Sequence, residues 1–305
     1  MLVSLKELMA DANEKGYAVG AFNVSSLETL TAIVQAAEET QKPVVLNWVE
    51  IHEPYLPMEP AALIMLDAAK KASVPMCVHL DHGSSMEMCM KAIRLGFTSV
   101  MLDASGEDYE TNVKETAEIV RLAHSVGVTV EAELGHIFAS SFGVSETSVN
   151  KEFENAEDAY TDPQLAKDFV ERTGVDVLAI AFGTTHGVYT TTPVLDLDRI
   201  TKIKEAIDIP FVMHGGSGLS KEEFQTAVKN GIRKINFYTY MVLAGGKAIK
   251  EAMQEKGADE LVFFHDLPKI ATDAMKEEVK NAILTFSMEV LRWEMIWQWE
   301  QKVLR

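Results

Sequence analysis

The chain has 305 residues, of which 47% are hydrophobic and 24% are charged, a composition typical of an ordinary globular enzyme. Its formal net charge of −18 argues against nucleic-acid phosphates or an anionic membrane surface as the main partner. We therefore expect neither nucleic acid nor a membrane as a partner. An acidic protein that handles an anionic substrate needs a local positive centre, which a metal ion can supply.

The N-terminal segment lacks a basic region followed by a long apolar stretch, so no signal peptide is evident. No apolar run approaches the length of a membrane span. The two cysteines, Cys77 and Cys89, lie in a predicted strand and a predicted helix. We interpret them as buried thiols of a reduced cytoplasmic protein, not as a disulfide framework.

After a short amphipathic helix over residues 5–14, strand-like apolar runs alternate with segments of helical periodicity. Several of these helices begin at Ser, Thr or Asp and stop at glycine, as capping chemistry predicts. The eight predicted strands are 18–24, 43–49, 75–80, 99–102, 128–134, 175–182, 210–213 and 232–238.

Eight strands that alternate with helices at intervals of very roughly 30 residues predict a (β/α)8 TIM barrel. A doubly wound sheet is the alternative, but it would rarely use so many evenly spaced units. We expect a barrel domain over residues 1–262 and a C-terminal helical extension over 263–305. The polar stretch 138–162 is too long for an ordinary connection and is predicted to be a functional loop over the barrel mouth.

The C-terminal tail carries aromatic and aliphatic residues at helical spacing, namely Phe286, Val290, Trp293, Ile296 and Trp297. Such a helix could pack on its own barrel. Clustered tryptophans also suit a subunit interface, which we favour slightly, and we expect a homodimer or homotetramer.

Three of the eight histidines, His82, His186 and His214, are followed by glycine, and each lies at or just past the end of a predicted strand. In TIM barrels the C-terminal ends of the strands carry the active site. Three imidazoles that converge there suit a tetrahedral zinc site with one position open for substrate. For a single histidine, a hydrogen-bonded core position would be the better explanation, but three at matched strand ends favour the metal site.

Further polar side chains are predicted at the same ends of the strands. Asp81 precedes His82 and is better placed as a base than as a fourth ligand. A zinc ion that polarises a neighbouring carbonyl would stabilise an enediolate by several kcal/mol, so this pair suits removal of a proton next to a ketone. The other polar side chains predicted at these strand ends are Asn23, Asp103, Glu133, Ser217, Asn236 and Thr239.

A lysine Schiff base is the rival chemistry. No predicted strand carries a lysine at its C-terminal end, because Lys234 lies at the start of the last strand and Lys42 precedes the second. Both are expected toward the wrong face of the barrel, which favours metal over imine.

The loop Gly215-Gly216-Ser217-Gly218 opens a helix after the seventh strand, where barrels often hold a phosphate. Such a loop alone is usually a turn. Followed by Asn236 and Thr239 on the next strand, it becomes a moderate signal for an anion site.

Five segments together resemble the motifs of the class II, zinc-dependent ketose-bisphosphate aldolases, the fructose/tagatose-bisphosphate aldolase family. They cover roughly residues 1–260 in order: His79-Leu-Asp-His82-Gly, Glu131-Ala-Glu-Leu-Gly135, Gly183-Thr-Thr-His-Gly187, His214-Gly-Gly-Ser-Gly218 and Lys234-Ile-Asn-Phe-Tyr-Thr239.

The resemblance implies an aldolase that uses Zn²⁺ and a small-molecule sugar phosphate, with a monovalent cation (Na⁺ or K⁺) nearby. It implies His82, His186 and His214 as zinc ligands and Asp81 as the proton-transferring base. Asp103 and Glu133 would be alternative or supporting metal contacts. The residues implied to hold a dihydroxyacetone-phosphate-like donor are Gly187, Gly215, Gly216, Ser217, Asn236 and Thr239, with Asn23 as a further substrate contact.

The chain also departs from the pattern of the family. The loop after Glu133 lacks the usual glycine pair and acidic residue, and Glu146 is the first acidic candidate for the general acid. A lysine often found after the second zinc histidine is absent from the segment that follows His186. After the second strand, Glu50 and His52 stand where the family carries small polar residues near a distal phosphate, which suggests a substrate other than fructose 1,6-bisphosphate.

Two other functions remain open. Within enzymes, the alternative is a barrel metallohydrolase that uses zinc-bound hydroxide. Outside enzymes, the chain could be a paralogue that binds metal and sugar phosphate without turnover, an option motivated by the altered loop and the missing lysine.

Overall fold

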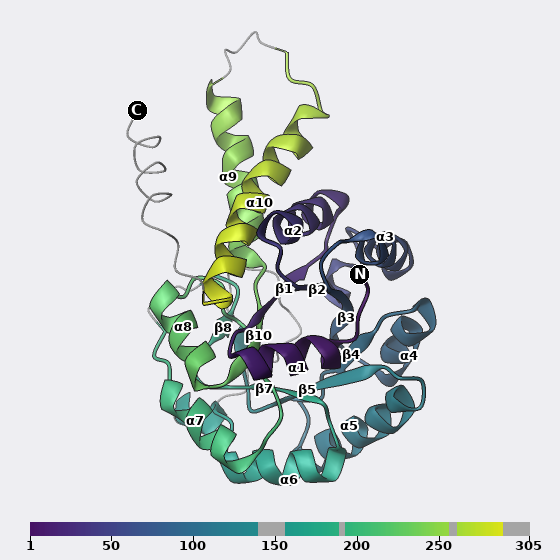
Figure 1. Cartoon of the computed structure of the whole chain (residues 1–305), viewed down its shortest axis with the longest axis vertical. Helices are drawn as coiled ribbons and strands as arrows, with labels where there is room; N and C mark the ends of the chain where they lie inside the picture. The colour runs from purple at the N-terminus through teal and green to yellow at the C-terminus, as the bar shows by residue number, and fades with distance from the viewer. Residues whose placement is uncertain (140–155, 189–192, 256–260, 289–305) are drawn as a thin grey trace.

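A computed structural model gives the structure of the chain, and it describes residues 1–139, 156–188, 193–255 and 261–288. Eight parallel strands form a closed barrel in the order β1-β10-β9-β7-β5-β4-β3-β2. Helices surround it, and α9 and α10 project from the ring as a hairpin (Figure 1). The predicted (β/α)8 barrel with a C-terminal helix is therefore confirmed.

The barrel strands are β1 (Val19–Asn23), β2 (Val44–Val49), β3 (Met76–Gly83), β4 (Ser99–Leu102), β5 (Thr129–Leu134), β7 (Val177–Ile180), β9 (Phe211–Met213) and β10 (Ile232–Asn236). Two further strands, β6 (Phe138–Ala139) and β8 (Thr185–His186), pair with each other outside the barrel. Periodicity placed all eight barrel strands within a few residues, but it missed this short pair.

The helices are α1 (Leu5–Lys15), α2 (Leu27–Thr40), α3 (Met58–Lys71), α4 (Met86–Leu95), α5 (Tyr109–His124), α6 (Pro163–Thr173), α7 (Leu197–Ala206), α8 (Lys221–Asn230), α9 (Thr239–Glu255) and α10 (Asp266–Phe286). Short 3₁₀ turns, η1 (Glu50–His52) and η2 (Ala156–Ala159), complete the described elements. Side chains of Ser26 and Ser85 accept the N–H groups of Thr29 and Met88, which caps α2 and α4. None of the described helices has the length and apolar character needed to cross a membrane.

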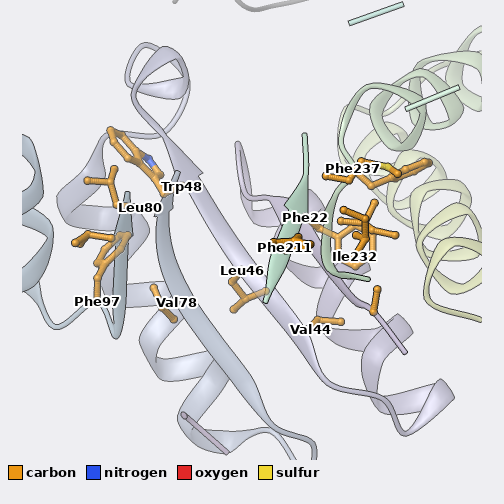
Figure 2. Packing of buried hydrophobic residues seen from close by; sticks show 14 of the residues in the cluster. Phe22, Val44, Leu46, Trp48, Val78, Leu80, Phe97, Phe211, Ile232 and Phe237 are labelled. Carbon is orange, nitrogen blue, oxygen red and sulfur yellow. The ribbon is translucent and has the colours of Figure 1, made fainter. Parts of the chain in front are cut away.

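Hydrophobic side chains fill the space between the strands and the outer helices. Trp48 of β2 pairs with Leu80 of β3 in the strand register, and both side chains are buried (Figure 2). Phe97, also buried, lies beside them in the same view. Burial of each large apolar side chain stabilises the fold by about 1.5–3 kcal/mol, so this layer holds the helices on the barrel.

The barrel interior changes character along its axis, because alternate residues of each strand point inward. A second buried cluster joins α1 to inward residues near the strand starts, among them Val45 and Cys77. Two residues further along, the buried side chains are Asn47 and His79. The N-terminal end of the barrel is thus apolar and closed by α1, whereas its C-terminal half is polar.

The C-terminal helix α10 packs against α2, α9 and α8. Its last residue, Phe286, is fully buried, with its ring 4.9 Å from that of Phe224, and its carbonyl accepts the N–H of Ala18 at 3.0 Å. This part of the tail therefore packs on its own barrel. Val290, Trp293, Ile296 and Trp297, on which the interface hypothesis depends, lie outside the described residues.

Candidate active site

The end of β3 carries an unusual backbone. The register with β4 shifts between Leu80 and Gly83, and His82 has φ +50°, a left-handed conformation that costs a non-glycine residue free energy. This irregularity allows Asp81 and His82 to be buried together at the strand end, with 2% and 8% of their surface exposed. Strained backbone of this kind is typical of functional sites.

The three histidines that precede glycine come together. The ring centroids are 4.6 Å apart for His82 and His214, 5.2 Å for His82 and His186, and 5.9 Å for His186 and His214. One nitrogen from each ring lies within 4.8 Å of the other two. Such a spacing leaves room for one metal ion in contact with all three.

The glycines make this approach possible. Gly215 has φ +64°, and a Cβ atom at this position would lie 2.6 Å from the carbonyl carbon of Thr185. The backbone after His214 therefore packs directly on the segment that carries His186. Any larger residue at Gly215 would push the two histidines apart.

Carboxylates orient two of the rings. His82 Nδ1 donates to Asp103 Oδ2 at 2.7 Å, and His214 Nε2 donates to Glu131 Oε1 at 2.8 Å. Because a carboxylate only accepts, the proton must lie on the histidine nitrogen that faces it. The other nitrogen of each ring is then free to face the centre of the cluster, an arrangement common in metal sites.

The buried polar atoms at the centre lack hydrogen-bond partners. His186 Nδ1, His214 Nδ1 and Glu133 Oε2 have none among the described residues, although the last two atoms lie 3.1 Å apart. An unpaired buried polar group costs free energy, so these atoms are suited to a ligand. Glu133 and Asp103 also form a possible metal-holding group with His82.

The electrostatics of the cluster favour a cation. Burial alone would lower the pKa of His82, but Asp81 and Asp103 raise it to about 10. Burial and the neighbouring His82 and His214 lower the pKa of His186 to about 3. The carboxylates that raise the pKa of His82 also favour a bound metal cation, and His82 would release its proton on binding the metal, because only neutral histidine is a ligand. His186 is already in that neutral form.

Asp81 is held by amides. Asn236 Nδ2 donates to both its oxygens at 3.0 Å, and Asn47 Nδ2 donates to Oδ2 at 3.2 Å. Although burial would raise the pKa of Asp81, the nearby His82 and Lys234 lower it. The carboxylate therefore stays ionised and able to accept a proton.

The side chain of Lys234 lies in the polar interior of the barrel, although its place in the predicted strand indicated the opposite face. Its side chain is fully buried inside the barrel, with Nζ 2.9 Å from Glu131 Oε2 and 2.8 Å from Asn236 Oδ1. The expectation that it faces away from the site is wrong, because its long side chain reaches the polar half of the barrel. It is engaged in an ion pair, so it is not a free nucleophile for a Schiff base.

Glu131, which the sequence placed in a motif with Glu133 but to which no role was assigned, is a central buried group of the site. It joins His214 to Lys234, and His79 lies 3.6 Å from its second oxygen. A signal existed, since Glu131 lies two residues before Glu133 and must point into the same interior. Asn47, whose side chain donates to Asp81, lies two residues after the inward-facing Val45, so the same alternation along the strand could have identified it.

We expect Lys234→Met to destabilise the fold by about 3–5 kcal/mol, because it leaves Glu131 buried without its cation. Thermal or urea unfolding of the purified variant measures this loss. Lys71→Met removes an exposed ion pair with Asp67 and is the matched control, for which we expect little change. Equal stability of the two variants would contradict the structural role of the buried pair.

A cavity of about 430 Å³ opens beside the histidines. The predicted substrate residues that line it are Asn23, Gly187, Gly215, Ser217, Asn236 and Thr239, together with Asp81, His82 and His186. Gly216 does not line the cavity, since a Cβ atom there would meet Met213 and Phe224 in the layer beneath. Glu146, the candidate general acid, lies outside the described residues.

Comparison with known proteins agrees with this barrel fold. Residues 3–289 match the family model for class II fructose-bisphosphate aldolase. A "probable fructose-bisphosphate aldolase" of Bacillus subtilis is 42% identical over 258 residues, covering 84% of this chain and 87% of that protein. The fructose-bisphosphate aldolase of Staphylococcus epidermidis is 38% identical over 291 residues, covering 93% and 97%.

Among solved structures, the YdjI aldolase from Escherichia coli K12 superposes with a TM-score of 0.82 at 36% identity, covering 95% of this chain and 98% of that one. Fold and site thus define a barrel lyase that makes or breaks carbon–carbon bonds. The chain belongs to the class II fructose-bisphosphate aldolase family.

Proposed function

We propose that the chain is a zinc-dependent aldolase that cleaves or forms a ketose phosphate, with a dihydroxyacetone-phosphate-like donor. The observation that carries this proposal is the convergence of three imidazoles, two of which, His82 and His186, line one cavity together with the ionised Asp81. Each component alone has simpler explanations. Together they supply a metal site and a base beside one substrate-sized space.

His82, His186 and His214 would hold the ion, because they offer one nitrogen each at suitable spacing and include buried atoms without partners. Three neutral imidazoles in a buried set suit a zinc ion that keeps its fourth position open for substrate. Glu133 and Asp103 would serve as alternative contacts or as the groups that fix the rings. When bound, the ion supplies a positive charge that polarises the ketone and stabilises negative charge on the neighbouring carbon.

Asp81 would move the proton at the carbon next to the ketone. Its two amide partners fix the carboxylate in place, and they donate to the same oxygens that would accept the proton. Positioning of this kind reduces the entropy that proton transfer costs. In our proposal Glu146 is the general acid, which donates a proton where Asp81 accepts one.

The loop after β9 would bind the donor phosphate. Gly187, Gly215 and Ser217 line one end of the cavity, and Thr239 begins α9 at the same place. Free N–H groups at the start of a helix attract an anion. A monovalent cation beside this phosphate, a homo-oligomeric assembly and a cytoplasmic location complete the proposal.

The test is metal analysis of the purified protein combined with a screen of ketose mono- and bisphosphates. We expect about one zinc per chain, release of a triose phosphate and an aldehyde from at least one ketose phosphate, and loss of turnover with a chelator. Hydrolysis of an ester or amide instead would indicate the metallohydrolase. Tight binding of a sugar phosphate without cleavage would indicate the non-catalytic paralogue.

A further inference from the structure

The two ends of the cavity have different linings. Gly187, Gly215 and Ser217 form one part of the lining, and the apolar side chains of Val49 and Ile51, at and just past the end of β2, form another. In the closed barrel β2, which leads to Val49 and Ile51, lies diametrically across from β7, which leads to Gly187. If the glycine-rich end holds the donor phosphate, the apolar end faces the acceptor aldehyde.

The charge at the acceptor end is unsuited to a second phosphate. None of the described residues that line the cavity is lysine or arginine. Glu50 stands between Val49 and Ile51, and its carboxylate accepts the N–H of Ser84 at 3.2 Å. A phosphate carries about −1.5 to −2 charges at neutral pH, so here it would meet a carboxylate nearby and apolar walls.

The polar groups at this end are neutral. Tyr238 lines the cavity, and its hydroxyl donates to Ser25 Oγ at 3.0 Å. The ring of His52 packs 4.8 Å from that of Tyr238 and is only 1% exposed. Burial lowers the pKa of His52 to about 4, so it stays uncharged at neutral pH. The Tyr238 hydroxyl therefore offers a neutral polar group to the hydroxyls of a sugar chain, and His52 behind its ring adds no charge.

We propose that the acceptor aldehyde carries no phosphate, so that the substrate is a ketose 1-phosphate rather than a ketose 1,6-bisphosphate. This inference rests on the proposed aldolase function. In cleavage the C3–C4 bond breaks, its electron pair stays on C3 as an enediolate, and the proton of the C4 hydroxyl passes to a base. The enediolate then takes a proton at C3, which gives a triose phosphate and an unphosphorylated aldehyde.

The experiment compares the zinc-loaded enzyme on fructose, tagatose and sorbose 1-phosphates and on their 1,6-bisphosphates, with triose phosphate release as the readout. We expect kcat/KM for the best monophosphate to exceed that for its bisphosphate by at least ~10-fold. Calorimetric binding of both ligands to the Asp81→Asn variant gives the same comparison without turnover, and we expect tighter binding of the monophosphate.

A cation placed at the apolar end should reverse part of this preference. Ile51 lines the cavity after β2 and is only partly buried, so Ile51→Arg can place its guanidinium there without disturbing the core. We expect it to lower the ratio of monophosphate to bisphosphate kcat/KM by ~5-fold or more, because arginine pairs with phosphate. Leu63→Arg, 73% exposed on α3, is the matched control and should leave the ratio unchanged.

The outcomes separate the two proposals. A wild-type preference for bisphosphates would overturn the acceptor inference and leave the aldolase function intact. An unchanged ratio in Ile51→Arg would show that the apolar end does not contact the acceptor. Cleavage of neither class by the zinc-loaded enzyme would overturn the aldolase function and this inference with it.

Discussion

His214→Ala should lose both bound zinc and turnover. His214 is fully buried and its free nitrogen faces the cluster, so its removal takes away one of three neutral ligands. Only two histidine ligands would remain, which are too few to hold zinc in competition with water. We expect zinc content below about a tenth per chain and activity reduced by more than ~10³-fold. Metal analysis and the triose phosphate assay measure both.

The substitution also removes the contacts of His214 with Glu131 and Glu133, although Lys234 still pairs with Glu131, so loss of folding must be separated from loss of metal. His186→Ala is the second variant, because His186 has no carboxylate hydrogen bond among those described. Its far-ultraviolet circular dichroism should match the wild type while zinc and activity are lost. His265→Ala, with a side chain 80% exposed, is the matched control and should retain both. Full zinc content in His214→Ala and His186→Ala would refute the assigned ligands.

Asp81→Asn should keep zinc and lose activity. The new amide has nearly the volume of the carboxylate, and its oxygen can accept the N–H groups of both Asn47 and Asn236 in place of Oδ2. The fold and the histidine cluster should therefore survive. An amide cannot take a proton at neutral pH, so we expect kcat to fall by ~10²–10⁴-fold, the usual worth of a general base.

The readouts for Asp81→Asn are metal content and single-turnover cleavage of the best ketose phosphate. Asp67→Asn, an exposed position on α3, serves as the control for removing one carboxylate and should behave as the wild type. Near-normal activity of Asp81→Asn would show that another group transfers the proton.

The barrel and its cluster of histidines could be predicted from the sequence because both follow from short-range patterns. Apolar runs identify the strands, and parallel strands bring their C-terminal ends to one edge. His82, His186 and His214 therefore had to lie near one another once the eight strands were recognised. The same reasoning predicted Asn23 and Ser217 at these strand ends, and both line the cavity.

The rest depended on geometry that one-dimensional patterns do not carry. The left-handed backbone of His82 and the register shift beside it are local strains imposed by the assembled sheet. Lys234 reaches the polar interior through a flexible side chain of four carbons, which its position at the start of a strand conceals. Ile51 and Leu243 line one cavity although they lie nearly two hundred residues apart in the sequence, and only the closed barrel brings them together.

The proposed function depends most on one metal ion shared by three imidazoles. Diffraction from crystals of the zinc-loaded protein, measured on both sides of the zinc absorption edge, locates that ion directly. We predict a single strong anomalous peak about 2.0–2.1 Å from one nitrogen each of His82, His186 and His214. A peak elsewhere, or histidine rings that point away from it, would contradict the proposed metal site.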